Sequence, residues 1–109
     1  MKNLTQLQDE FIELSADRTL QLGIIAANEI EISQLKFQAE IDVHLGAEYA
    51  GLKNDAQRTA QVKSLLIAGG FFDKEAKVAL AKREVSMLDA QIRVCAWSID
   101  SLIKGGANY

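Results

Sequence analysis

Apolar residues recur at alternating intervals of three and four through the stretch from residue 78 to residue 102. An α-helix with this spacing carries one continuous apolar stripe, here called the seam, which is buried against another helix. The seam consists of Val78, Ala81, Val85, Leu88, Ile92, Cys95, Ile99 and Leu102. The pattern therefore predicts a long C-terminal helix that packs on at least one other helix.

A second heptad pattern runs through the N-terminal part of the chain, and polar residues interrupt it. Its positions are Leu4, Leu7, Phe11, Leu14, Arg18, Gln21, Ile25, Asn28, Ile32, Leu35 and Ala39. Polar residues on such a stripe lower stability but can fix the register or the oligomeric state. Alternatively, the stripe shifts locally onto Leu22 and Ile24, beside Gly23. The pattern leaves both arrangements open.

Capping signals and glycine pairs predict where the helices begin and end. A capping box pairs a cap side chain with a Glu or Gln three residues later. The candidate boxes are Asn3–Gln6 or Thr5–Gln8 for the first helix and Asn54–Gln57 for the second. Asp73 is a candidate cap for the third helix, and glycine pairs at 69–70 and 105–106 favour helix ends. The predicted helices are 4–50, 54–68 and 73–104, in one domain (1–104) followed by a flexible tail (105–109).

The fold class that follows is all-α. Residues 37–45 alternate between apolar and polar as a strand would, but no second strand-like segment exists to pair with them. The chain contains no proline, so no residue forces a helix to stop. We expect a long N-terminal helix, a short middle helix and a long C-terminal heptad helix, arranged as a coiled-coil-like hairpin or a helical bundle. The third helix also has a second apolar row (Leu80, Met87, Val94), which predicts a second neighbouring helix. That neighbour comes either from a three-helix bundle or from self-association.

Charge is divided unevenly along the chain. Residues 1–52 hold three basic and nine acidic residues, a net charge of −6, whereas residues 53–109 hold nine basic and six acidic residues, a net charge of +3. Opposite charges on the two halves suit a chain that folds back on itself. The other interpretation is a surface for a charged partner.

The residues needed for catalysis or metal binding do not come together in the sequence. His44 is the only histidine, and a metal site needs three or four suitable ligands. Cys95 is the only cysteine, lies on the seam and has no basic neighbour at helical spacing to activate it. Basic residues of the third helix are interspersed with acidic ones, which does not favour direct nucleic-acid binding. We expect no enzyme activity, no metal and no cofactor.

The single cysteine fits a reducing cytoplasm, and no apolar run in the sequence is long enough to span a bilayer. The N-terminus shows no charged-then-apolar leader with a small-residue cleavage site. We therefore expect a cytoplasmic protein that does not act at a membrane.

Two groups of residues are candidates for contact with a partner. Trp97 lies on the third helix away from the seam, one turn after Arg93, and either closes a second interface of the bundle or anchors a partner. Asp9, Glu10, Glu13 and Asp17 form an acidic ridge along one edge of the first helix. Such a ridge is either a solvated face or a mimic of a nucleic-acid backbone.

The passage Leu52-Lys-Asn-Asp-Ala-Gln-Arg-Thr-Ala60 lies between an acidic helix and a heptad helix. In Asn54, Arg58 and Ala60, and loosely over residues 47–103, the chain resembles small helical-hairpin proteins of tailed phages and prophages. These proteins are often encoded near single-strand annealing recombinases. The resemblance implies an accessory role in DNA metabolism or interference with a host defence.

Three functions are compatible with these patterns. The first is a non-enzymatic phage-type protein that forms a homo-oligomer and acts by binding another protein, such as one of the bacterial host. The second is an acidic inhibitor of a bacterial defence or nuclease complex. The third is a structural coiled-coil spacer.

Overall fold

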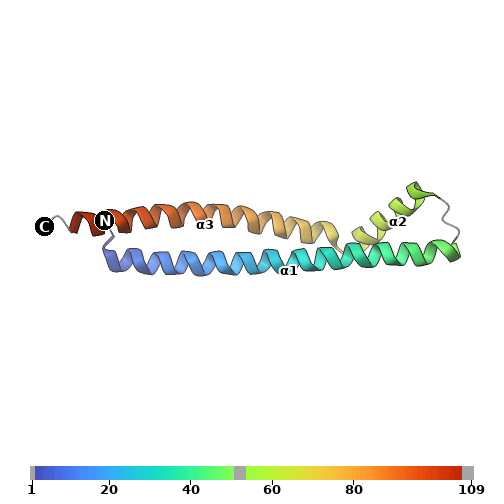
Figure 1. Cartoon of the computed structure of the whole chain (residues 1–109), viewed down its shortest axis with the longest axis horizontal. Helices are drawn as coiled ribbons and strands as arrows, with labels where there is room; N and C mark the ends of the chain where they lie inside the picture. Colours follow the sequence, from blue (N-terminus) through green and yellow to red (C-terminus); the bar gives the residue numbers. More distant parts are fainter. Residues whose placement is uncertain (1, 51–53, 107–109) are drawn as a thin grey trace. The chain divides into compact units, whose positions relative to one another are not determined.

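The computed structural model describes residues 2–50 and 54–106, and these residues form three helices and no strand. They are α1 (Leu4–Ala50), α2 (Asp55–Ala68) and α3 (Phe71–Gly106), as Figure 1 shows. The all-α prediction, with a short helix between two long ones, is confirmed. The segment with strand-like alternation, residues 37–45, is helical and belongs to α1. The last three residues of the predicted tail, 107–109, lie outside the described part of the chain.

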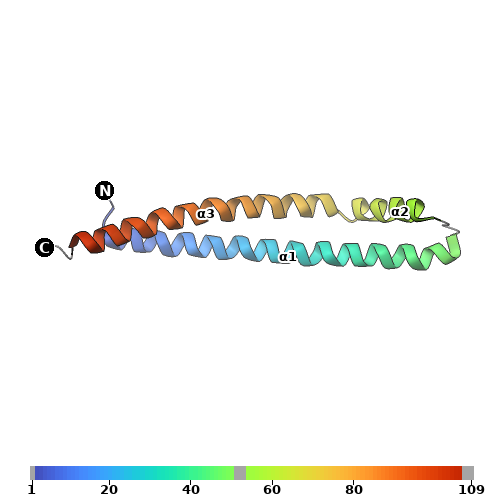
Figure 2. The ribbon, with the colours of Figure 1, turned by 45° about the horizontal axis from the view of Figure 1, so that its top comes forward.

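The chain divides into two compact units, which are described separately. Among the described residues, unit 1 comprises 2–24 and 80–106, and unit 2 comprises 25–50 and 54–79. In unit 1, the start of α1 runs antiparallel to the second part of α3, and the two lie side by side in both views (Figures 1 and 2). Unit 2 contains the second part of α1, all of α2 and the first turns of α3.

The start of α1 shows which of the two candidate capping boxes forms. The backbone N–H of Gln6 donates to Asn3 Oδ1 at 2.8 Å, and the backbone N–H of Asn3 donates to Gln6 Oε1 at 2.9 Å. Two N–H groups that would otherwise lack acceptors are thereby satisfied by side chains. The Asn3–Gln6 box caps α1.

The junction between α2 and α3 is built on the glycine pair at 69–70. The N–H of Gly69 donates to the carbonyl of Leu65 at 3.0 Å, and Gly70 has a φ of 79°, which favours glycine. The carbonyl of Gly70 then accepts from the N–H of Lys74 at 3.1 Å. Gly70 thus takes the capping place predicted for Asp73. As a result, α3 begins at Phe71, two residues before the predicted start.

α1 continues without a break through Gly23 and Gly46. The structure also decides between the two stripes left open by the pattern, because Leu22 and Ile24 are exposed. The polar heptad residues Arg18, Gln21 and Asn28 are half-buried instead. The stripe therefore keeps its heptad register and carries polar residues in its middle.

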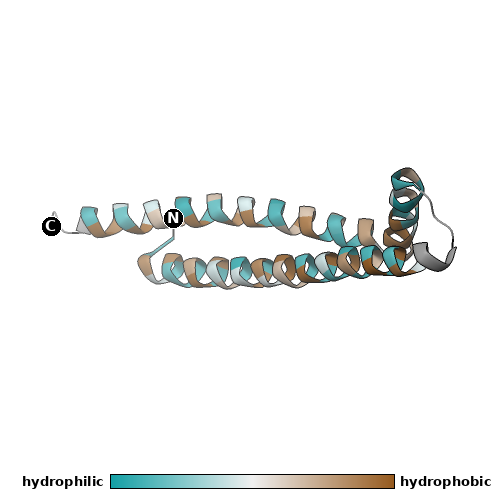
Figure 3. Cartoon of the chain, turned by 45° about the vertical axis from the view of Figure 1, so that its right-hand side comes forward, coloured by the Kyte–Doolittle hydropathy of each residue, from teal (hydrophilic) through white to brown (hydrophobic). Residues whose placement is uncertain are grey.

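The seam of α3 faces inward along most of its length. Its members in unit 1 are buried (Ala81, Leu88, Cys95) or half-buried (Val85, Ile92, Ile99), and only Leu102, near the helix end, is exposed. Val78, the member in unit 2, is also buried. The hydropathy colouring of Figure 3 shows hydrophobic bands on the side of α3 that faces α1. The core of unit 1 is therefore the predicted helix–helix interface.

Unit 2 is held together around the start of α3. Phe71 is buried, and the ammonium of Lys36 lies 5.3 Å from the centre of its ring, a cation–π distance. Lys74 Nζ donates to Glu31 Oε2 at 2.6 Å, which ties α3 to α1 within this unit. α2 contributes no buried residue, so α1 and the first turns of α3 supply the buried side chains of the unit.

Candidate interaction surface

A close contact at the end of unit 1 positions the two helices on which the surface is built. Cys95 Sγ donates to the carbonyl oxygen of Leu7 at 3.2 Å, and both residues are buried. Because a backbone carbonyl accepts this bond, α3 must approach the backbone of α1 closely here. Cys95 therefore has a structural role in the seam.

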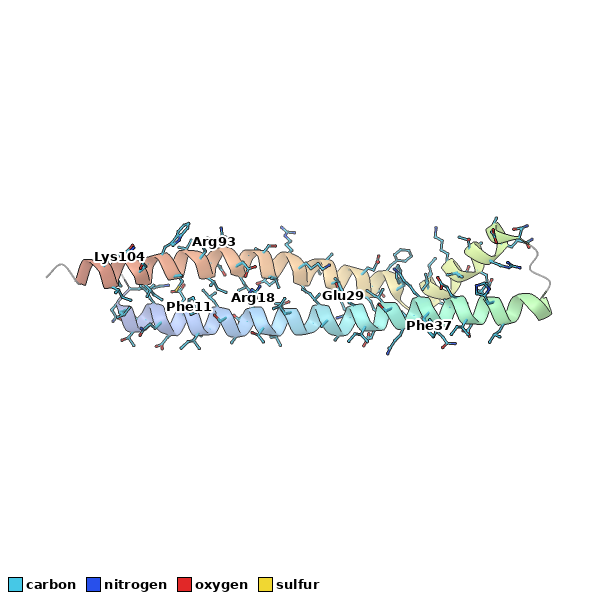
Figure 4. The ribbon with its side chains drawn as sticks, in the orientation of Figure 1. Phe11, Arg18, Glu29, Phe37, Arg93 and Lys104 are labelled. Carbon is cyan, nitrogen blue, oxygen red and sulfur yellow. The ribbon has the colours of Figure 1, made fainter. Side chains whose placement is uncertain are left out.

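An ion pair sets the register of the same two helices. Arg18 Nε donates to Asp89 Oδ1 at 2.5 Å, which joins α1 to α3 across the seam. Figure 4 shows Arg18 between the two helices, together with Phe11. The side chains of Arg18 and Asp89 are 40% and 42% exposed, so the pair contributes about 0.2–1 kcal/mol. It joins the turn of α1 that holds Arg18 to the turn of α3 that holds Asp89.

Beside this seam, unit 1 has an open hollow of about 810 Å³ between the start of the chain and α3. Its lining is mainly apolar, with Leu7 on one wall and Val94, Trp97 and Leu102 on the other. Apolar concave surfaces with a few polar groups at the rim are typical binding sites. The hollow lies directly beside Trp97, the tryptophan singled out from the sequence.

The charged residues that line the hollow are Lys2 and Glu10. The ammonium of Lys2 contacts the Glu10 carboxylate, and this hydrogen bond raises the pKa of Lys2 above its ordinary value of 10.5. Glu10 is the one member of the acidic ridge placed at the hollow. The other three members, Asp9, Glu13 and Asp17, are exposed along α1.

The outer side of α3 carries an uncovered apolar row. This row, here called the outer row, consists of Leu80, Met87, Ala90, Val94 and Trp97. Its four large side chains are 66%, 51%, 58% and 63% exposed, in chain order. Single exposed apolar residues are common, whereas several on one helix face, here Met87 to Trp97 with Leu80 two turns earlier, mark an interaction site. The interface that Trp97 was expected to close within a bundle is not formed in the described residues, where its side chain remains exposed.

Arg93 lies on α3 one turn before Trp97, on the side away from α1, as Figure 4 shows. Its side chain is exposed, so Arg93 and Trp97 share an outward-facing stretch of helix. Arginine and tryptophan are the residue types most often found at the energetic centres of protein interfaces. The structure thus brings together Trp97, Arg93 and, across the hollow, Glu10. It leaves the rest of the acidic ridge on α1.

Among the described residues, no group of three or more His, Cys, Asp or Glu side chains is arranged to hold a metal ion. His44 is exposed on α1. In the same part of the chain, no helix combines the length and the apolar character that crossing a membrane requires.

The sequence analysis did not identify three contacts that shape this surface: Arg18 with Asp89, Lys2 with Glu10, and Cys95 with Leu7. The first and third contacts depend on which turn of α1 lies against which turn of α3. The second depends on the position of Lys2, which precedes α1. The position of Arg18 on the polar stripe was the only signal, because a charged residue facing a seam needs a partner.

Comparisons of the chain with protein-family models, curated proteins and solved structures found no match.

Proposed function

We propose that this protein acts without catalysis, by binding other protein chains through the outer row of α3 and the hollow beside it. The proposal rests on one observation: α3 is packed on its seam side, and on its outer side it exposes four large apolar residues, Leu80, Met87, Val94 and Trp97. Leaving so much apolar surface in water is unfavourable, and burial in an interface relieves that cost.

The proposed setting is a phage or prophage protein in the bacterial cytoplasm, working as a homo-oligomer. Support for it is the resemblance carried by Asn54, Arg58 and Ala60, together with the single buried cysteine. A small helical pair with a free apolar face is suited to binding, because its contact residues are held on a rigid element.

Affinity capture from bacterial lysate, with and without nuclease and read by mass spectrometry, tests this function. The wild type should retain a stoichiometric host protein, and Trp97→Ala should lose it. Ile12→Ala removes an equally exposed side chain from α1 and serves as the matched control. If wild type and Trp97→Ala recover nothing beyond the bait, no host protein is bound, and the protein has a self-assembling structural role instead.

The exposed carboxylates of Asp9, Glu13 and Asp17 favour one second candidate function, inhibition of a nuclease or defence complex by mimicry of nucleic acid. The pairing of Glu10 with Lys2 removes one charge from the ridge. Replacing the four ridge residues, Asp9, Glu10, Glu13 and Asp17, with Asn or Gln should abolish inhibition if mimicry operates. Binding that survives the replacement assigns the function to the outer row alone.

A further inference from the structure

We infer that the outer row of α3 is the docking site for a second copy of this chain, with the two α3 helices antiparallel about a two-fold axis. This inference rests on the proposed function and names the partner for that surface. The axis passes at the level of Leu88 and Asp89, so that residue i of one copy lies opposite residue 177 − i of the other.

The order of large and small side chains supports a self-complementary row. In this register the exposed Leu80 lies opposite Trp97 of the second copy, and Met87 lies opposite its Ala90. Each layer thus combines a larger and a smaller side chain, as packing between close helices requires. Because of the two-fold axis, each of these two pairs occurs twice in the dimer. Every residue of the outer row except Val94 therefore faces an apolar residue of the second copy.

Charge selects this register over the alternative displaced by one heptad. In the alternative, where residue i faces 184 − i, the two-fold axis passes at residue 92, so the Arg93 residues of the two copies lie at nearly the same level, and like charges repel. In the proposed register Arg93 lies at the level of Glu84, which carries the opposite charge, and Val94 faces the aliphatic stem of Arg83. The Arg83 guanidinium then lies one turn from the partner's Trp97, within the reach of a cation–π contact.

The available area also matches a weak but specific dimer. An aromatic residue such as Trp97 carries about 150–250 Å² and an aliphatic one somewhat less, and the four large residues of the row are exposed by half to two thirds, so the row offers on the order of 500 Å². Two copies together bury about 1,000 Å², the lower range for a specific interface. The dimer is therefore expected to dissociate on dilution.

Trp97 is the only tryptophan, so its fluorescence reports on this surface directly. Ultracentrifugation and fluorescence of the full chain over a dilution series should show a dimer with blue-shifted emission that becomes a monomer with red-shifted emission. Met87→Lys should give the red-shifted monomer at every concentration. Ile12→Lys, on α1 and equally exposed, should behave as wild type.

Cysteine cross-linking tests the register, in a Cys95→Ser background that keeps a hydrogen-bond donor for Leu7. A Met87→Cys chain mixed with an Ala90→Cys chain should form a mixed disulfide readily. Faster linkage between Met87→Cys and Trp97→Cys chains would overturn the register in favour of the displaced one.

A chain that stays monomeric with red-shifted emission, or a dimer that Met87→Lys does not weaken, overturns the inference. Such a monomer can still retain a host protein through Trp97 in the capture experiment. In that case the interaction function stands, and only the identity of the partner is wrong.

Discussion

Arg18 lies where a heptad pattern would normally hold an apolar residue, and its partner Asp89 remains partly exposed. A half-buried leucine at this position would contribute about 1 kcal/mol, and the ion pair it replaces contributes about 0.5 kcal/mol. We therefore expect Arg18→Leu to raise the free energy of unfolding by about 0.5 kcal/mol in chemical denaturation. Asp89→Asn, the control, should lower it slightly. A loss of stability in Arg18→Leu would show that the ion pair outweighs the apolar contact.

The pair formed by Glu31 and Lys74 makes stability depend on pH. The hydrogen bond from Lys74 lowers the pKa of Glu31 below its ordinary value of 4.5. A carboxyl whose pKa is lower in the folded chain adds stability above its unfolded pKa, and this stability is lost as the pH falls through the folded pKa.

Lys74→Met should therefore raise the pKa of Glu31 toward 4.5, as measured by NMR titration of its carboxyl carbon. The variant should be less stable than wild type at neutral pH, and the difference should disappear at pH values below the folded pKa. An unchanged titration of Glu31 in the variant would contradict the assigned cause.

At the scale of the element, α3 presents two apolar faces with different roles. Leu88 on the seam is 4% exposed, whereas Leu80 on the outer row is 66% exposed. Leu88→Ala should cost about 2–5 kcal/mol of unfolding free energy, because it opens a cavity in the core. Leu80→Ala should change it by less than about 0.5 kcal/mol in dilute solution. Similar costs for the two variants would mean that the outer row is covered within one chain.

The turn between α2 and α3 depends on Gly70. At a φ of 79°, a side chain is strained by about 1–2 kcal/mol. Gly70→Ala should destabilise the chain by that amount, and Gly70→Asn by less. Gly23→Ala is the contrasting variant, because a Cβ there meets no atom within 4 Å, and it should raise stability by about 0.8–1 kcal/mol. Denaturation curves in which Gly70→Ala matches wild type would contradict this account of the turn.

Periodicity was sufficient to predict the three helices, because the apolar stripes repeat over many turns and Asn54 and Gly70 mark clear ends. The seam positions were predicted for the same reason. The predicted start of α3 was two residues too late. The prediction assumed that the Asp73 side chain caps the helix, whereas the carbonyl of Gly70 already accepts from the N–H of Lys74 and α3 begins at Phe71. The hollow beside Trp97 could not be predicted, since it depends on how Lys2 and Leu7 lie against α3.

In the complete protein, the outer row of α3 is expected to be covered when the protein functions. Met87 and Trp97 are suited to test it, because both are exposed in the single chain and both side chains react readily with hydroxyl radicals. Phe37, exposed on α1, provides an internal reference outside the row.

Hydroxyl-radical footprinting of the assembled protein against the diluted single chain is the most direct measurement. The account predicts strong protection of Met87 and Trp97 in the assembly, with Phe37 oxidised equally in both samples. Equal oxidation of Met87 and Trp97 in the two samples would contradict the claim, whatever the partner in the assembly.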